Sequence, residues 1–190
     1  GTVLDALGRA DEALQSYSTA QGLDPNDSGF LYNAATVLVA LGRPEKAVPL
    51  FQKAIGLRSD HVEARVNLAS TLGMLARDEE AEVEARRAVE LSPDTTETHY
   101  GLAQVLLAQR KHVAAAESFS SSLRCNPDNF PATAGLLNAC LATCNWRDYD
   151  TLVERVRGEI TKGNQQVRAL SAFGALSLPL SHEELANVAT

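Results

Sequence analysis

The stretch VEARVNLASTLGMLARDEEAEVEARRAVELSPDT, residues 62–95, is one copy of a pattern that returns along the chain every 34 residues. Four columns of residues keep this spacing before and after it. They are Ala13, Ala47, Ala81 and Ala115; Tyr17, Phe51, Ala85 and Phe119; Ala20, Ala54, Ala88 and Ser122; and Pro25, Ser59, Pro93 and Pro127. Because all four columns share one register, we infer an internal repeat.

Each column has a physical reason within a pair of helices. Leu68, Ala69 and Leu72 have the spacing that places apolar residues on one face of a first helix. The alanine column falls where a second helix crosses the first, because a methyl group permits close approach there. Phe51, four residues after Ala47, would fill the space between helices. The proline column ends the second helix, and a neighbouring Asp or Asn can cap the helix that follows.

A turn is expected between the two helices of each unit. The dipeptides at the expected turns are Leu7-Gly8, Leu41-Gly42, Leu75-Ala76 and Gln109-Arg110. Gly8 and Gly42 suit a left-handed turn that ends the first helix.

The period and the columns resemble the tetratricopeptide repeat, a helix-turn-helix unit. The expected fold is all-α. The resemblance implies a right-handed α-solenoid whose first helices line a concave face. We expect a repeat array over residues 1–144, with a partial repeat at 1–27, complete repeats at 28–61, 62–95 and 96–129, and a fifth beginning at 130. Residues 145–190 are expected to form a helical transition segment, with helices over 149–160, 167–178 and from Pro179, the last capped by Ser181.

The pattern breaks at the stretch CNWRDYD, residues 144–150, where Tyr149 falls on the alanine column and Val153 on the aromatic column. This stretch resembles the end of the repeat array in the protein O-linked N-acetylglucosamine transferases, glycosyltransferase family 41, including its SPINDLY-like members. In that family a similar Cys-Asp-Trp-x-Asp-Tyr-Asp stretch leads into the catalytic region. The later segment PLSH, residues 179–182, resembles a family segment near the start of that region.

The resemblance implies a chain that recruits polypeptide substrates and is not itself catalytic. In the family, asparagines along the concave face hold the peptide backbone, and here Asn33 and Asn67 occupy equivalent positions. Gly101 breaks this series in the next unit, and no catalytic residue can be carried over. The parent enzyme would use a nucleotide sugar such as UDP-N-acetylglucosamine, bound by a C-terminal catalytic domain that these residues lack. Because the chain begins inside a repeat, we expect it to be part of a longer protein. A free-standing repeat adaptor that binds peptide segments is the alternative.

The composition of the chain limits which classes of partner are expected. The net charge is -7 and no block of Lys and Arg occurs, which argues against a nucleic-acid partner. No apolar run approaches the roughly 20 residues of a membrane span. The three cysteines have no regular spacing, so a reduced, cytoplasmic protein is expected, nuclear also in a eukaryote.

Several residues admit a chemical and a structural interpretation. Asn33 and Asn67 are either peptide clamps or polar residues of a solvated helix face. Cys140 and Cys144 could bind a metal ion, but they lack a Cys or His partner at suitable spacing, so no metal site is expected. The four histidines are assigned to surface or capping roles. The remaining candidates are assigned to packing and capping, namely Trp146, Tyr149, Asp148 and Asp150.

Overall fold

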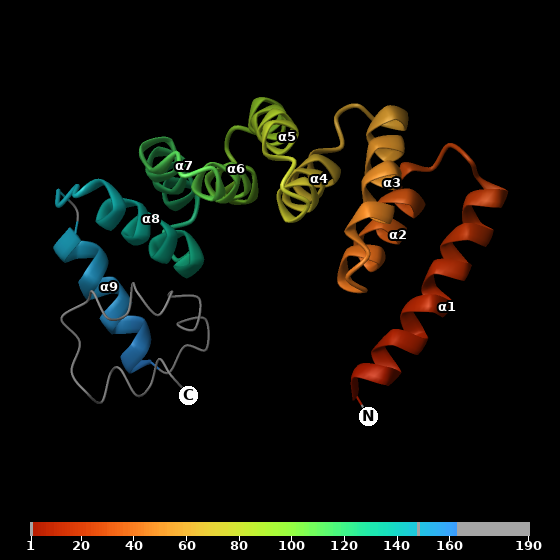
Figure 1. The fold of residues 1–190 in the computed structure, drawn as a ribbon, viewed down its shortest axis with the longest axis horizontal. Helices are drawn as coiled ribbons and strands as arrows, with labels where there is room; N and C mark the ends of the chain where they lie inside the picture. The colour runs from red at the N-terminus through yellow and green to blue at the C-terminus, as the bar shows by residue number, and fades with distance from the viewer. Residues whose placement is uncertain (1, 148, 163–190) are drawn as a thin grey trace. The chain divides into compact units, whose positions relative to one another are not determined.

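The computed structural model describes residues 2–147 and 149–162, which form nine helices and no strand (Figure 1). The all-α prediction is confirmed. The chain divides into two compact units, Gly1–Pro93 (unit 1) and Asp94–Thr190 (unit 2). Unit 1 contains α1 (Thr2–Leu23), α2 (Ser28–Ala40), α3 (Pro44–Leu57), α4 (Val62–Met74) and α5 (Asp78–Leu91). Unit 2 contains α6 (Thr96–Ala108), α7 (His112–Cys125), α8 (Phe130–Thr143) and α9 (Tyr149–Thr161).

The helices follow the sequence period. The first helices α2, α4, α6 and α8 begin at positions 28, 62, 96 and 130, and the second helices α3, α5 and α7 begin at 44, 78 and 112. Each first helix packs against the second helix that follows it. The predicted spacing of 34 residues is therefore the spacing of the helix pairs.

Left-handed residues between the helices keep the same spacing. They are Gly42 (φ 67°), Ala76 (φ 54°), Arg110 (φ 59°) and Cys144 (φ 52°). The residue after each of the first three donates its backbone N–H back into the last turn of the preceding helix, as Arg43 does to the Leu38 carbonyl at 2.9 Å. The turns predicted at residues 41–42, 75–76 and 109–110 are confirmed, and Cys144 is their counterpart in the fifth unit.

The turn predicted at Gly8 is wrong, because α1 runs without interruption from Thr2 to Leu23. A glycine permits a left-handed turn but does not impose one. The helical pattern of α1 therefore continues through Gly8.

The capping prediction holds at two helix starts. The Asp27 carboxylate accepts a hydrogen bond from the Gly29 backbone N–H at 2.7 Å, and the Asn129 side chain accepts one from the Ala132 N–H at 3.2 Å. The equivalent residue of α4 is His61, whose side chain makes no such cap bond.

In α3, α5 and α7 the first three predicted columns lie in the core, whereas their α1 members Ala13, Tyr17 and Ala20 are half-buried. Ala47, Ala81 and Ala115 are fully buried, as are Phe51 and Phe119. The third column, Ala54, Ala88 and Ser122, is fully buried too. Ser122 is accommodated because its hydroxyl donates to the Thr96 carbonyl at 3.1 Å, so the polar group keeps a hydrogen bond.

The last helix replaces the column residues of the earlier units with other types. Val153, on the aromatic column, is 4% exposed, and Tyr149, on the alanine column, is half-buried. Val156 lies one period after Ser122 and is fully buried, as Ser122 is. The alanine is therefore lost from the column in α9, while its apolar residues stay in the core.

Some expectations lie outside the described residues. These are the helices over 167–178 and from Pro179, the Ser181 cap, the PLSH segment and the capping role of Asp148.

Candidate peptide-binding site

Asn33 and Asn67, the predicted peptide-binding residues, lie on the two successive first helices of unit 1. Asn33 is exposed on α2, and Asn67 is half-buried on α4. Helices α2 and α4 contact one another. The Asn67 side chain is held in place, because its Nδ2 donates a hydrogen bond to the Tyr32 hydroxyl at 3.2 Å. The two amides are therefore presented differently, one extended into solvent and one anchored.

Tyr32 is the centre of an aromatic cluster that supports Asn67. Its ring lies 6.1 Å from the Phe51 ring, with the planes at 54°, and 5.0 Å from the His61 ring, at 39°. Phe51 is fully buried, and His61 is 5% exposed at the start of α4. The hydroxyl that receives Asn67 is thus fixed by rings from α2, α3 and the α4 terminus. Sequence reasoning missed Tyr32, although Tyr100 repeats it two periods later.

His61 is the residue of this cluster whose pKa is shifted. Burial lowers its pKa, and Arg58 lowers it further, because both disfavour the imidazolium. Glu63 opposes this shift through a contact between its Oε2 and His61 Nδ1 at 3.1 Å. Arg58 lies 3.8 Å from the same carboxylate oxygen. The net effect favours the neutral form of the His61 ring, which lies tilted against Tyr32.

The same positions in unit 2 are built differently. Tyr100 repeats the aromatic arrangement, with its ring 5.9 Å from that of Phe119. Its hydroxyl accepts a hydrogen bond from Gln104 Nε2 at 2.6 Å, within the same helix. Gly101 and Gly135 stand where unit 1 has Asn33 and Asn67. A Cβ atom on Gly135 would lie 2.3–2.7 Å from three atoms of the Phe119 ring. The ring occupies the space of a side chain, so unit 2 offers no amide there.

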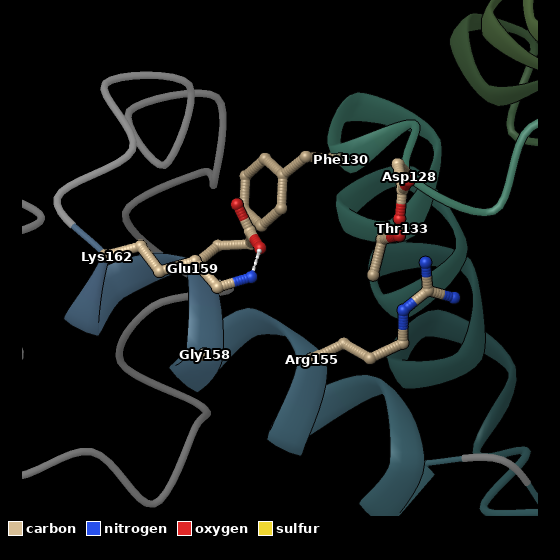
Figure 2. A pocket seen from close by; sticks show the side chains of 7 residues that line it. All are labelled: Asp128, Phe130, Thr133, Arg155, Gly158, Glu159 and Lys162. Atoms are coloured by element: carbon tan, nitrogen blue, oxygen red, sulfur yellow. Dashed lines mark hydrogen bonds and ion pairs between the residues drawn. The ribbon is translucent and has the colours of Figure 1, made fainter.

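A cavity of about 500 Å³ lies between α8 and α9 in unit 2 (Figure 2). Gly158 of α9 lines this cavity and has no atom within 4 Å of its Cβ position. Glu159 pairs with Lys162 at 2.7 Å, and Arg155 donates to the Pro127 carbonyl. Because these charged side chains already have partners, the lining gives no reason to expect a ligand of either charge. It is lined by Asp128, Phe130, Thr133, Arg155, Gly158, Glu159 and Lys162.

The junction residues pack on one another. Trp146 is 56% exposed, and its ring meets that of Tyr149 edge to face, with centroids 5.1 Å apart and planes at 81°. Cys140 is buried, whereas Cys144 is exposed at its left-handed turn. Within residues 2–147 and 149–162, no group of three or more His, Cys, Asp or Glu side chains is placed to hold a metal ion.

None of the helices in the described ranges combines the length and the apolar character that a membrane crossing requires.

Comparison with known proteins identifies the repeat. Residues 38–105 and residues 1–27 match two family models, both described as tetratricopeptide repeat, and together the matches cover half of the chain. A search of the curated proteins gave no match.

Several solved structures share the fold. MamA from Desulfovibrio magneticus RS-1 (residues 41 to the end) is 20% identical, with a TM-score of 0.70 over 86% of this chain and 92% of that one. YrrB, described as a TPR protein with an unusual peptide-binding site, is 21% identical, with a TM-score of 0.64 over 80% and 79%. A mutant of the O-GlcNAc transferase from Thermobaculum terrenum is 26% identical, with a TM-score of 0.57 over 62% of this chain and 22% of that chain.

Proposed function

Since this chain belongs to the tetratricopeptide-repeat family, we propose that it binds an extended segment of a partner protein through Asn33 and Asn67 of unit 1. The observation that carries the proposal is the anchored amide of Asn67, whose Nδ2 is held by the Tyr32 hydroxyl. An ordered side chain loses less conformational entropy on binding than a mobile one.

The chemistry of the two amides suits a peptide backbone. An asparagine offers a carbonyl acceptor and two N–H donors. When one N–H of Asn67 bonds to Tyr32, its Oδ1 and the second N–H remain for a backbone N–H and a backbone carbonyl. Such contacts do not depend on the partner's side chains, so this site would accept many sequences in extended conformation.

In its more specific form, the proposal is that this binding recruits polypeptide substrates for an O-linked N-acetylglucosamine transferase-like enzyme. Two observations support it: the CNWRDYD stretch at residues 144–150 and the likeness to the Thermobaculum terrenum transferase. The catalytic domain and its nucleotide sugar would belong to the parent protein. The test is the coding sequence after the codon for Thr190. A region of alternating strands and helices supports the proposal, and a stop codon contradicts it.

A free-standing adaptor is the second candidate function. It is favoured by the likeness to YrrB and MamA, which extends over most of both chains. The adaptor needs no transferase domain, so the same coding sequence distinguishes the two. Peptide binding through Asn33 and Asn67 is common to both.

The binding itself can be tested with peptides selected by this chain from a phage-displayed library of random 12-residue sequences. We expect Asn33→Ala with Asn67→Ala to weaken the selected peptides at least tenfold, while the free energy of unfolding changes by about 1 kcal/mol or less. Backbone N-methylation of the peptides should have a similar effect, because it removes the N–H donors. Gln104→Ala, which removes the amide beside Tyr100, is the control. Unchanged binding by the double variant would reject these residues as the site.

A further inference from the structure

Unit 1 contains a cleft that is formed by helices other than α2. A cleft of about 250 Å³ opens between α3 and α5 above α4. Its floor is apolar, because Leu68 and Leu72 of α4 line it and are each only 1% exposed. Val83 of α5 adds an apolar wall and is 65% exposed. Gln52 of α3 lies opposite.

The opening of this cleft carries negative charge. Glu79, Glu80 and Glu84 line it. Glu80 is paired with Arg77 through two contacts of 2.7 Å, and Glu84 with Arg65 at 2.5 Å. Glu79 has no ion pair within the described part of the chain. Unit 1 as a whole has 14 Asp and Glu residues against 9 Lys and Arg residues. A basic partner therefore meets both a local carboxylate and a favourable long-range field.

The size of the cleft limits what can enter it. Sites for small molecules typically enclose about 300–1,000 Å³, so this cleft is suited to one side chain of a larger partner. An apolar floor requires an apolar side chain, because a polar group buried there would lose its hydrogen bonds to water. The acidic rim favours cationic residues on either side of that side chain.

We propose that this cleft binds a leucine or isoleucine side chain of a partner protein segment in which lysine or arginine flanks the apolar residue. The apolar floor anchors the aliphatic side chain, and Glu79 pairs with a neighbouring cation. The amides of Asn33 and Asn67 take no part, so this inference does not depend on the proposed function.

The experiment uses the whole chain, labelled with ¹⁵N, and the synthetic peptide GKKLKKG as probe, followed by amide chemical shifts. We expect saturable shifts around Leu68, Leu72 and Val83. A probe with serine in place of leucine should bind at least tenfold more weakly, because a buried leucine side chain is worth roughly tenfold to a hundredfold in affinity. A probe with glutamate in place of the lysines should give no shifts at the cleft.

Protein variants separate the floor from the rim. Val83→Asp should abolish the preference for leucine over serine, whereas Val113→Asp, at a valine of unit 2 that is also 65% exposed, should leave it unchanged. Glu79→Lys should weaken the leucine probe severalfold, whereas Glu97→Lys, in the first turn of α6, should not. Equal affinity of the leucine and serine probes would overturn the proposal, because it would indicate simple attraction of a polycation. Absence of shifts at the cleft would overturn it as well.

Discussion

Tyr32 in unit 1 and Tyr100 in unit 2 stand at the same repeat position, two periods apart, yet their hydroxyls have different partners. Tyr32 accepts from Asn67 of the next first helix, and Tyr100 accepts from Gln104 of its own helix. The difference originates one period later, where unit 1 has Asn67 and unit 2 has Gly135. Both units therefore have the tyrosine–phenylalanine pair. Whether an asparagine amide can bond to the tyrosine depends on the residue one period later.

Unit 2 gains tighter packing in exchange for the missing amide. The fully buried Phe119 ring lies so close to α8 that only glycine fits at position 135. In unit 1 the equivalent aromatic, Phe51, lies against Tyr32 much as Phe119 lies against Tyr100, but position 67 carries an asparagine side chain. The same repeat position thus allows close packing against Phe119 in unit 2 and carries the Asn67 amide in unit 1.

The largest effect is expected from Gly135→Ala, which breaks the close packing of unit 2. The added methyl group would overlap the buried Phe119 ring, so we expect a loss of about 3 kcal/mol in the free energy of unfolding, measured by urea denaturation. Gly158→Ala in α9 is the control, because its Cβ position has no neighbour within 4 Å. That control should stabilise the protein by about 0.5–1 kcal/mol through helix propensity. Equal behaviour of the two variants would contradict the close approach.

A smaller loss is expected from Ala81→Leu in unit 1. Ala81 is fully buried where α5 crosses α4, so a larger side chain should cost about 2 kcal/mol through overpacking. Val83→Leu, on the exposed side of α5, should change the free energy of unfolding by less than about 0.5 kcal/mol. An unchanged melting temperature for Ala81→Leu would refute the alanine column.

The comparison of the two tyrosines is sharpened by Tyr32→Phe and Tyr100→Phe. Each variant keeps the ring and removes one hydrogen bond, so each should lose about 1 kcal/mol of stability. Only Tyr32→Phe should also weaken the display-selected peptides, because it releases the Asn67 amide. If both variants weakened binding equally, Tyr32 would have no special role in presenting Asn67.

The smallest effect concerns pH and is confined to unit 1. Because the pKa of folded His61 lies below its usual value of 6.5, the unfolded chain binds a proton first as the pH falls. The contribution of His61 to stability is complete above pH 6.5 and is lost as the pH falls from 6.5 through the folded pKa. We expect the melting temperature to fall between pH 7.5 and pH 5, and to fall less in His61→Asn. The same slope in the variant would show that other groups carry the pH dependence.

Much of the fold could be predicted because the repeat encodes it locally and redundantly. Column residues such as Ala81 and Phe51 mark the buried positions of each helix pair. The left-handed turn residue at Gly42 recurs one and two periods later, at Ala76 and Arg110. The turn expected at Gly8 is the failure, because a glycine permits a left-handed residue without requiring one, and α1 continues through it.

The sequence by itself determined the period, the helix pairs, the buried columns and the two candidate asparagines. Those features depend on residues at fixed spacing, and spacing can be read along the chain. Only the tertiary structure decided that Tyr32 holds Asn67, that Phe119 requires glycine at position 135, and that Val83 and Glu79 border an apolar cleft. These depend on distances between side chains from different helices, which the packing of the folded chain fixes and no single spacing encodes.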